Sequence, residues 1–354
     1  MAVDEARIEQ VMGQLVGYMT GLAMCLGIWI GEEVGFYRTL AGAGPLSADE
    51  VAAKTNTNPR LTREWLDGQT SGGLIGYDES ADTYELAPET AMALADETAP
   101  VFVARAMNAF GSLFIDIDKI KAAFTSPSGG LPWGDHDHRL FLGTEWFFRP
   151  GYRAALPDAW IPALSGVVEK LDEGAKVADV GCGHGASSIV MASRWPASHF
   201  YGFDYHDASI AASRERASEA GVAGNTTFAL ANAKSYGGTY DLICFFDCLH
   251  DMGDPVGIAS YAKEHLGPDG TVLLVEPFAL GDRIKNIREN PMAPLLYLAS
   301  STVCTPNSLS QEVGLGLGAQ AGPDKLRGVF EEAGYSTFRV AQETPLNLII
   351  EAKA

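Results

Sequence analysis

The sequence has 354 residues, of which 47% are hydrophobic and 20% are charged, and this composition excludes a largely disordered or collagen-like chain. Because single hydrophobic cores stop growing at about 250 to 300 residues, a chain of this length predicts two domains. The 45 acidic and 25 basic side chains give a formal net charge of −20, which disfavours a nucleic-acid partner because it would repel a polyanion.

The first long apolar segment, residues 11–31, contains no charged residue and is long enough to cross a bilayer. It also contains five glycines, lacks a flanking basic cluster and runs directly into Glu32, features that are atypical of a membrane span. Gly13, Gly17 and Gly21 recur every four residues, a spacing that lets two helix backbones approach closely. We therefore expect a helix buried between two copies of the chain, and no membrane role.

Residues 45–88 have the pattern of a winged helix. Ser47, with Glu50 three residues later, predicts a capping box at the start of one helix, and the Asn-Pro pair at 58–59 predicts the start of a second. Residues 74–86 alternate around a polar tip, which predicts a two-stranded wing.

Winged helices often bind DNA, with the second helix and the wing close to phosphates. The wing here contains four acidic residues and neither Lys nor Arg, so it would repel a phosphate backbone. A transcription regulator is therefore disfavoured, and we expect a structural or dimerising role. The acidic residues of the wing are Asp78, Glu79, Asp82 and Glu85.

The aromatic-rich helical stretch at about 100–170 is interrupted by the loop SPSGGLPWGDHDHR. Its residues 135–138 are Asp-His-Asp-His, the side-chain types that ligate metals, but no helix or strand spacing would converge them. We expect a solvated loop and no metal. The five cysteines are odd in number and widely spread, and the N-terminal residues are acidic, which favours reduced thiols in a cytoplasmic protein.

After residue 175 the pattern changes to short β-branched runs that alternate with helical segments, which predicts a parallel sheet covered by helices. The runs are KVADV, HFYGFD, TTFAL, YDLICFF and TVLLVE. Two further extended runs, 336–341 and 346–351, are separated by a short turn and predict a hairpin that closes the sheet.

A glycine-rich turn, VADVGCGHG, occupies residues 177–185 at the end of the first of these strands. Gly181, Gly183 and Gly185 let the backbone pass close to a ligand, and the next helix offers free N–H groups. Asp204 closes the following strand, where a carboxylate can accept both ribose hydroxyls. This pattern indicates a cofactor that contains a nucleoside, and it leaves an NAD-dependent oxidoreductase open.

The segments FFDCLHDMGDP and LGPDGTVLLVEPF, with the terminal hairpin, resemble class I S-adenosylmethionine-dependent methyltransferases. With the winged helix, nearly the whole chain resembles the small-molecule O-methyltransferases of plant caffeate and bacterial polyketide pathways. The resemblance implies an α/β fold with a Rossmann-like seven-stranded sheet, preceded by a mostly helical winged-helix dimerisation domain. The implied boundaries are a dimerisation domain at 1–100, a helical linker and lid at 101–170, and an S-adenosylmethionine-binding domain at 171–354.

The same resemblance implies a cofactor site. The methionine part of S-adenosylmethionine would contact Asp179 and the three glycines at 181, 183 and 185, and Asp204 would bind the ribose. Asn232 stands where the family usually has an acid that binds adenine, and an amide can still form such a hydrogen bond. Phe246 would lie near the sulfonium or the adenine, or would be a core residue.

In the resembling enzymes a histidine removes the proton of the substrate hydroxyl, and His250 in Leu-His-Asp-Met matches it. Glu276 matches the acid that orients this histidine, while Gln320 stands where the family has a second orienting glutamate. An imidazole with a pKa near about 6.5 can act as a base at neutral pH. The alternative for His250 is a structural histidine that is satisfied by its neighbours.

The long insert at 278–322 matches the segment that covers the acceptor in this family, and its Tyr297, Ser301 and Cys304 would either line a pocket or pack. Cys304 would need a nearby base to act as a nucleophile, and the sequence does not show one. The resulting hypothesis is a homodimer that methylates a small-molecule hydroxyl. The alternatives are a non-catalytic S-adenosylmethionine-binding regulatory protein and a C-, N- or S-methyltransferase that works by alignment alone.

Overall fold

The computed structural model describes residues 3–354. The chain divides into two compact units, one formed by residues up to 111 with 142–150, and the other by 112–141 with 151–354. Residues 101–170, expected to form a linker and lid, therefore contribute to both units. Each unit is described by itself.

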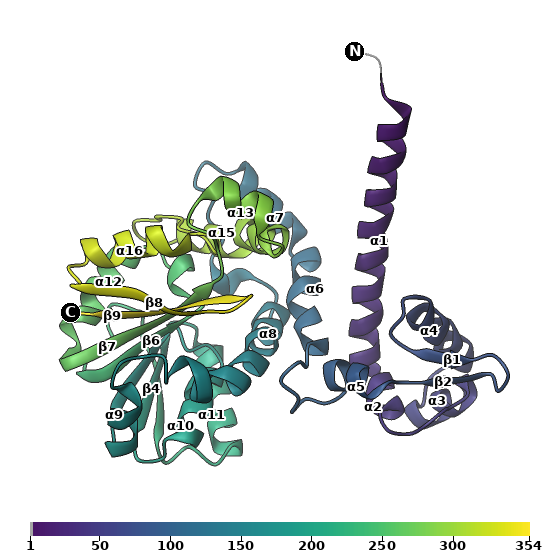
Figure 1. The fold of residues 1–354 in the computed structure, drawn as a ribbon, viewed down its shortest axis with the longest axis horizontal. Coiled ribbons are helices and arrows are strands. Elements are labelled where there is room, and N and C mark those ends of the chain that lie inside the picture. The colour runs from purple at the N-terminus through teal and green to yellow at the C-terminus, as the bar shows by residue number, and fades with distance from the viewer. Residues whose placement is uncertain (1–2) are drawn as a thin grey trace. The chain divides into compact units, whose positions relative to one another are not determined.

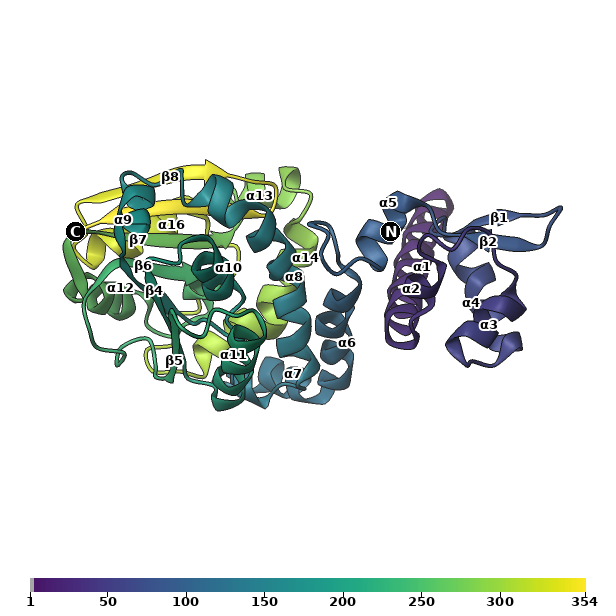
Figure 2. The same cartoon turned by 90° about the horizontal axis from the view of Figure 1, so that it is seen from below.

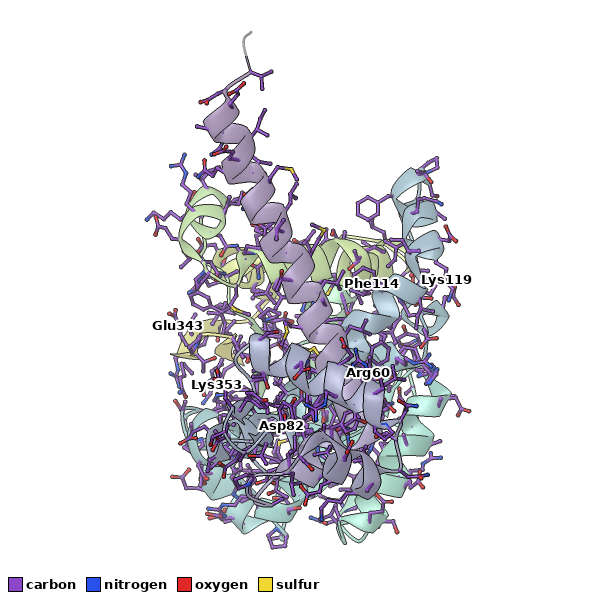
Figure 3. The ribbon with its side chains drawn as sticks, turned by 90° about the vertical axis from the view of Figure 1, so that its right-hand side faces the viewer. Arg60, Asp82, Phe114, Lys119, Glu343 and Lys353 are labelled. Carbon is purple, nitrogen blue, oxygen red and sulfur yellow. The ribbon has the colours of Figure 1, made fainter. Side chains whose placement is uncertain are left out.

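The first unit begins with the long helix α1 (Glu5–Val34), which is capped by the Asp4 side chain and ends at Gly35 in the left-handed region (Figure 1). Among the described residues, this is one helix whose length and apolar composition would suit a membrane span, and none of its most apolar 18-residue window is buried. Figure 3 shows side chains projecting on all sides of its first turns. Its exposed apolar residues include Ile8, Val11, Met12, Leu15, Val16, Met19, Leu22 and Leu26.

The winged helix follows as predicted. Ser47 and Glu50 form the capping box, the Asn58 side chain caps the second helix, and the two wing strands pair antiparallel. The core of this unit contains Tyr37, Leu66 and Tyr84. Its elements are α2 (Phe36–Leu40), α3 (Ala48–Thr55), α4 (Pro59–Ser71), β1 (Gly76–Asp78), β2 (Thr83–Glu85) and α5 (Pro88–Leu94).

The basic side chains of α4 form ion pairs with acidic side chains. Arg63 donates two hydrogen bonds to the carboxylate of Asp82 on the wing, at 3.0 and 3.1 Å, and Arg60 pairs with Glu64 one turn along the helix. Figure 3 labels Arg60 and Asp82. Positive charge on this helix is thus matched by carboxylates of the same unit.

The loop at 126–139 differs at one residue from the prediction of a solvated loop. His136 is buried, and its Nδ1 lies 3.2 Å from the carboxylate of Asp116, which also accepts the N–H of Asp137. The prediction of a solvated loop is therefore wrong at His136, because a buried carboxylate holds it in the interior. Within residues 3–354 no group of three potential ligands forms a metal site. Along the sequence, the helices between residues 104 and 160 are η1 (Ala104–Ala106), α6 (Met107–Ile115), α7 (Ile117–Thr125), η2 (Trp133–Asp135), α8 (Arg139–Ala155) and η3 (Leu156–Trp160).

The second unit contains the predicted seven-stranded sheet, with strand order β5-β4-β3-β6-β7-β9-β8. All neighbouring pairs are parallel except those made by β9, which runs antiparallel to β7 and β8 and so forms the predicted closing hairpin. The strands are β3 (Lys176–Val180), β4 (His199–Asp204), β5 (Thr226–Leu230), β6 (Tyr240–Phe246), β7 (Leu266–Pro277), β8 (Thr337–Glu343) and β9 (Asn347–Lys353).

Helices cover both faces of this sheet (Figures 1 and 2). One face carries α9 (Val167–Glu173), α10 (Ala186–Arg194) and α11 (Asp207–Glu219), and the other carries α12 (Pro255–Glu264) and α16 (Gly322–Glu332). The 3-10 turn η4 (Leu249–Asp251) follows β6. The insert after β7 consists of α13 (Arg283–Glu289), α14 (Ala293–Ala299), the π-helical turn η5 (Ser300–Cys304) and α15 (Thr305–Leu309).

Candidate active site

The predicted site residues cluster because parallel strands end at the same edge of a sheet. The glycine turn follows β3, Asp204 is the last residue of β4, the turn with His250 follows β6, and Glu276 is the penultimate residue of β7. Since β3, β4, β6 and β7 are consecutive parallel neighbours in the order β4-β3-β6-β7, their carboxyl ends lie side by side.

Backbone hydrogen bonds fix the glycine turn. The N–H groups of Gly181 and Cys182 both donate to the carbonyl of Phe203, and the N–H of Gly183 donates to Asp204 Oδ2 at 2.9 Å. Gly183 has φ = 51°, and a Cβ placed there would meet no protein atom within 4 Å. The turn therefore presents bare backbone to open space, as a close ligand contact requires.

Asp179 is buried beneath this turn with one oxygen unsatisfied. Its Oδ2 accepts the hydroxyls of Ser187 and Ser188 from the start of α10, both at 2.6 Å, whereas its buried Oδ1 has no hydrogen-bond partner. Burial raises the pKa of Asp179 to about 6, although the two serine bonds oppose the shift. A buried acceptor without a partner is unfavourable, so Oδ1 is suited to a donor on a bound ligand.

The other residues predicted to bind the cofactor differ from one another in burial and in hydrogen bonding. Asp204 accepts the N–H of His206 at 2.8 Å as well as that of Gly183, and burial raises its pKa. Asn232 is exposed in the turn after β5, where its Oδ1 accepts the N–H of Lys234 at 2.8 Å. The ring of Phe246 is buried at the end of β6 against another aromatic side chain. Asp204 thus joins the glycine turn directly, and the ligand contacts of these residues stay predictions.

His250 and Glu276 form a buried pair, as the resemblance implied. The carboxylate of Glu276 contacts His250 twice: Oε2 pairs with the ring Nδ1, and Oε1 accepts the backbone N–H at 3.2 Å. Burial alone would lower the pKa of His250, but Glu276 and Cys304 outweigh this effect and hold the pKa well above its ordinary value. The carboxylate therefore orients the ring and stabilises its protonated form.

Gln320 does not orient this histidine. Its side-chain oxygen accepts a bond of 2.7 Å from Asn286, and its amide donates to the carbonyls of Phe278 and Ala319. These bonds tie the two ends of the insert together. The position that matches the family's second glutamate thus has a structural role here.

Two polar groups beside His250 were not assigned from the sequence. Asp247, immediately after β6, has φ = 50° and accepts bonds from Tyr152 and Asn347, and burial together with Glu276 raises its pKa well above the usual range. Cys304, from the insert, is the second such group, and with Glu276 it raises the pKa of His250. An unusual left-handed aspartate has no sequence signal, and Cys304 approaches from a distant insert.

The comparisons with known proteins agree with this geometry. Residues 171–334 match a family described as a methyltransferase domain, and residues 22–96 match a family described as an Rv2258c-like winged HTH domain. The chain is an S-adenosylmethionine-dependent methyltransferase. No curated protein matches the sequence.

Solved structures similar to this methyltransferase include three with low sequence identity. An O-methyltransferase family protein from Burkholderia thailandensis is 17% identical, with a TM-score of 0.71 and coverage of 100% of this chain and 99% of that chain. The mitomycin 7-O-methyltransferase MmcR is 16% identical, with a TM-score of 0.66 and coverage of 99% and 100%. Human N-acetylserotonin methyltransferase in complex with SAM is 19% identical, with a TM-score of 0.65 and coverage of 99% and 98%. At these identities the similarity shows a shared fold.

The residues of this methyltransferase fit S-adenosylmethionine, its cofactor. The unpartnered Oδ1 of Asp179 suits the ammonium of the methionine part, and the open backbone at Gly183 permits close approach of the ligand. Asp204, at the end of the next strand, retains lone pairs for ribose hydroxyls because each of its oxygens accepts one backbone bond. Buried carboxylates also favour a cationic ligand.

We predict that Gly183→Ala weakens binding of S-adenosylhomocysteine at least about tenfold, because the new methyl group occupies space that the ligand needs. Gly221→Ala is the matched control: Gly221 also has a positive φ, 72°, and open space at the Cβ position, but lies in the turn after α11. Both variants should lose similar stability, about 1 kcal/mol, from backbone strain. Titration calorimetry and thermal melts check this, and equal affinities for the two variants would contradict it.

Proposed function

We propose that this methyltransferase methylates a hydroxyl of a small-molecule acceptor and that His250 is the general base. The observation that carries the proposal is the buried contact between His250 Nδ1 and Glu276 at the sheet edge that also bears the glycine turn. A histidine placed there and oriented by a carboxylate has the chemistry and the location that removal of a hydroxyl proton requires.

In this proposal the cofactor, Glu276 and His250 have different roles. The bound cofactor supplies an electrophilic methyl group. Glu276 accepts a hydrogen bond from the N–H at Nδ1, which leaves Nε2 free to take the proton of the acceptor hydroxyl, and the carboxylate then stabilises the imidazolium. Alignment of two bound reactants can contribute about 7 to 11 kcal/mol, while a general base contributes about a hundred- to ten-thousand-fold in rate.

The proposal includes a homodimer whose interface covers α1. The helix carries a long row of exposed apolar side chains, and a monomeric soluble protein rarely leaves a contiguous patch of this kind uncovered. A Cβ at Gly13, Gly17 or Gly21 would meet nothing within 4 Å, so this stripe is free for close approach by a second helix. A second copy is favoured over lipid because the helix leads directly into Glu32 and Glu33 without a basic flank.

We further propose a cytoplasmic protein without a nucleic-acid partner. The acid pairing of Arg60 and Arg63 supports this, since it leaves the second helix of the winged helix without unmatched positive charge. The net charge of −20 supports it as well.

His250→Ala should reduce the rate of hydroxyl methylation by about two to four orders of magnitude while S-adenosylhomocysteine affinity is kept. The matched control is His199→Ala, at the opposite end of β4. Product formation with a panel of phenols and binding by calorimetry check the prediction. A loss below about threefold would instead favour methylation of carbon, nitrogen or sulfur by alignment alone, and cofactor binding without any product would favour a regulatory protein.

The pH dependence follows from the raised pKa of His250. The ring must lose its proton to act as a base, so kcat/KM should rise with pH and level off only above the ordinary histidine pKa. Glu276→Gln removes the charge that raises this pKa and leaves desolvation, so the midpoint should move to lower pH and the plateau should fall. Asp247, Asp251 and Cys304 also interact electrostatically with the ring and remain in the variant. An unchanged midpoint would contradict the assignment.

The dimer is tested by the double substitution Leu15→Glu, Leu22→Glu on α1. Light scattering should give about twice the chain mass of 37.7 kDa for the wild type and a single chain mass for the variant, because charge on the apolar face opposes burial. Leu61→Glu, on the exposed face of α4, is the control and should remain dimeric. A wild-type monomer, or wild-type protein that sediments with membranes, would overturn this part of the proposal.

A further inference from the structure

The turn that carries His250 is weakly held by its own backbone. Two hydrogen bonds close this 3-10 turn. The N–H of Asp251 donates to the carbonyl of Cys248 at 3.3 Å, and the N–H of Met252 donates to the carbonyl of Leu249 at 3.2 Å. Both distances exceed the usual N–H···O distance of about 2.9 to 3.0 Å. We therefore expect contacts from outside the turn to fix the direction of the imidazole.

The insert supplies such contacts, because it donates hydrogen bonds to four consecutive carbonyls, those of residues 250–253. The bonds run from the N–H of Gly318 to His250 at 3.0 Å, from the side-chain amides of Asn307 and Gln311 to Asp251, both at 3.1 Å, from the hydroxyl of Ser308 to Met252 at 2.8 Å, and from the N–H of Leu315 to Gly253 at 2.9 Å. The insert thus holds the backbone of His250 and of the three residues after it.

Gln311 is the side chain that contacts this turn with both a donor and an acceptor. Its Nε2 donates to the carbonyl of Asp251 at 3.1 Å, and its Oε1 accepts the N–H of Gly253 at 3.0 Å. One amide group therefore bonds to the backbone on both sides of Met252. Two bonds from one planar group fix the direction of the backbone as well as its position, whereas a single bond allows rotation.

The backbone around Gln311 lies directly on the turn. A Cβ placed at Gly253 would lie 2.6 Å from the Cβ of Gln311 and 2.6 Å from the carbonyl oxygen of Glu312. Gly253 does not have a positive φ, so glycine is needed here for close packing and not for a special conformation. The contact between the two segments thus leaves no room for a side chain at Gly253.

The chain beyond Gln311 adopts an unfavourable conformation to reach the turn. Val313 has φ = 72°, although it is exposed and β-branched, and Gly314 has φ = 60°. The next residue, Leu315, then donates to the carbonyl of Gly253. Since a β-branched residue rarely occupies this region, the surrounding bonds must impose the conformation.

We propose that Gln311 is a positioning residue for His250, because its two bonds to the turn keep the imidazole in contact with Glu276. The proposal rests on the function proposed above and extends it. Glu276 holds the ring and the backbone N–H of His250, and Gln311 holds the backbone that follows. Without the second contact the turn can rotate the ring away from the carboxylate. The Gln311 bonds end on backbone atoms of the turn, so the residue acts through the turn.

The test is Gln311→Leu, a side chain of similar size that forms no hydrogen bond. With the phenol that the wild type methylates best, kcat should fall about ten- to hundredfold, since a catalytic group displaced by about 1 Å loses rate on this scale. KM should change less than about twofold, whereas mere loosening of the insert over the acceptor would raise KM instead. Calorimetry should give an unchanged affinity for S-adenosylhomocysteine.

Glu312→Leu is the matched control. Glu312 is the next residue and is also exposed, and its ion pair is with Lys234, at 3.9 Å. This variant should keep the wild-type kcat, and thermal melts should show that both variants are folded. An unchanged kcat in Gln311→Leu, or an equal loss in the control, would overturn the proposal.

A second readout follows the ring itself and does not depend on catalysis. In protein labelled with ¹³C-histidine, the NMR signal of His250 is assigned by its loss in His250→Ala and titrated with pH. Its midpoint should move to lower pH in Gln311→Leu, because a ring that leaves Glu276 loses the interaction that raises its pKa. The other groups that interact with the ring are unchanged in the variant: Asp247, Asp251 and Cys304.

An unshifted midpoint would overturn the positioning role even if kcat fell. A double-mutant cycle adds a further check: once Glu276→Gln has removed the carboxylate, Gln311→Leu should lower kcat by less than about threefold, and a full additional loss would contradict the proposal. If His250→Ala remained active, the proposed base would fail, while the histidine titration would still report whether Gln311 orients the ring. The two failures are therefore distinguishable.

Discussion

The buried pair of His250 and Glu276 is the constraint on which the carboxyl edge of the sheet depends. A carboxylate taken out of water at the end of β7 needs a partner, and the ring Nδ1 and the backbone N–H of His250 both supply one. The contact fixes the turn after β6. The insert then forms hydrogen bonds with carbonyl groups of this turn. The geometry of the turn after β6 and of the insert packed on it therefore depends on one desolvated charge.

The same edge of the sheet brings several acidic side chains together. Asp179, Asp204, Asp247 and Asp251 have pKa values raised by burial, that of Asp251 to about 7. A cation bound among them would relieve the repulsion that these groups share, whereas a neutral ligand would not. The site is thus electrostatically matched to the cofactor with its sulfonium charge more than to the product, which has lost that charge.

Much of the fold and part of the site could be predicted from sequence because the signals are local. The β-branched runs, the capping box at Ser47 and the glycine turn each depend on a few neighbouring residues. The pairing of His250 with Glu276 came from the resemblance to a known family. The position of the insert beside the turn with His250 could not be predicted, because the bonds that place the insert join residues 56 apart in the sequence and show no periodicity. The prediction of a solvated His136 is wrong for the same reason: its run of polar residues is typical of a solvated loop, but Asp116, 20 residues away, holds the ring in the interior.

The side chain of Asn307 connects two segments that are distant in the sequence. Its amide nitrogen donates to the carbonyl of Asp251, and its oxygen accepts the N–H of Trp133 at 2.9 Å, so one side chain connects the loop around Trp133 to the turn that carries His250. A movement of that loop either breaks this bond or pulls the turn with it. The Asn307 amide therefore couples the positions of two segments that lie 118 residues apart in the sequence, from Trp133 to Asp251.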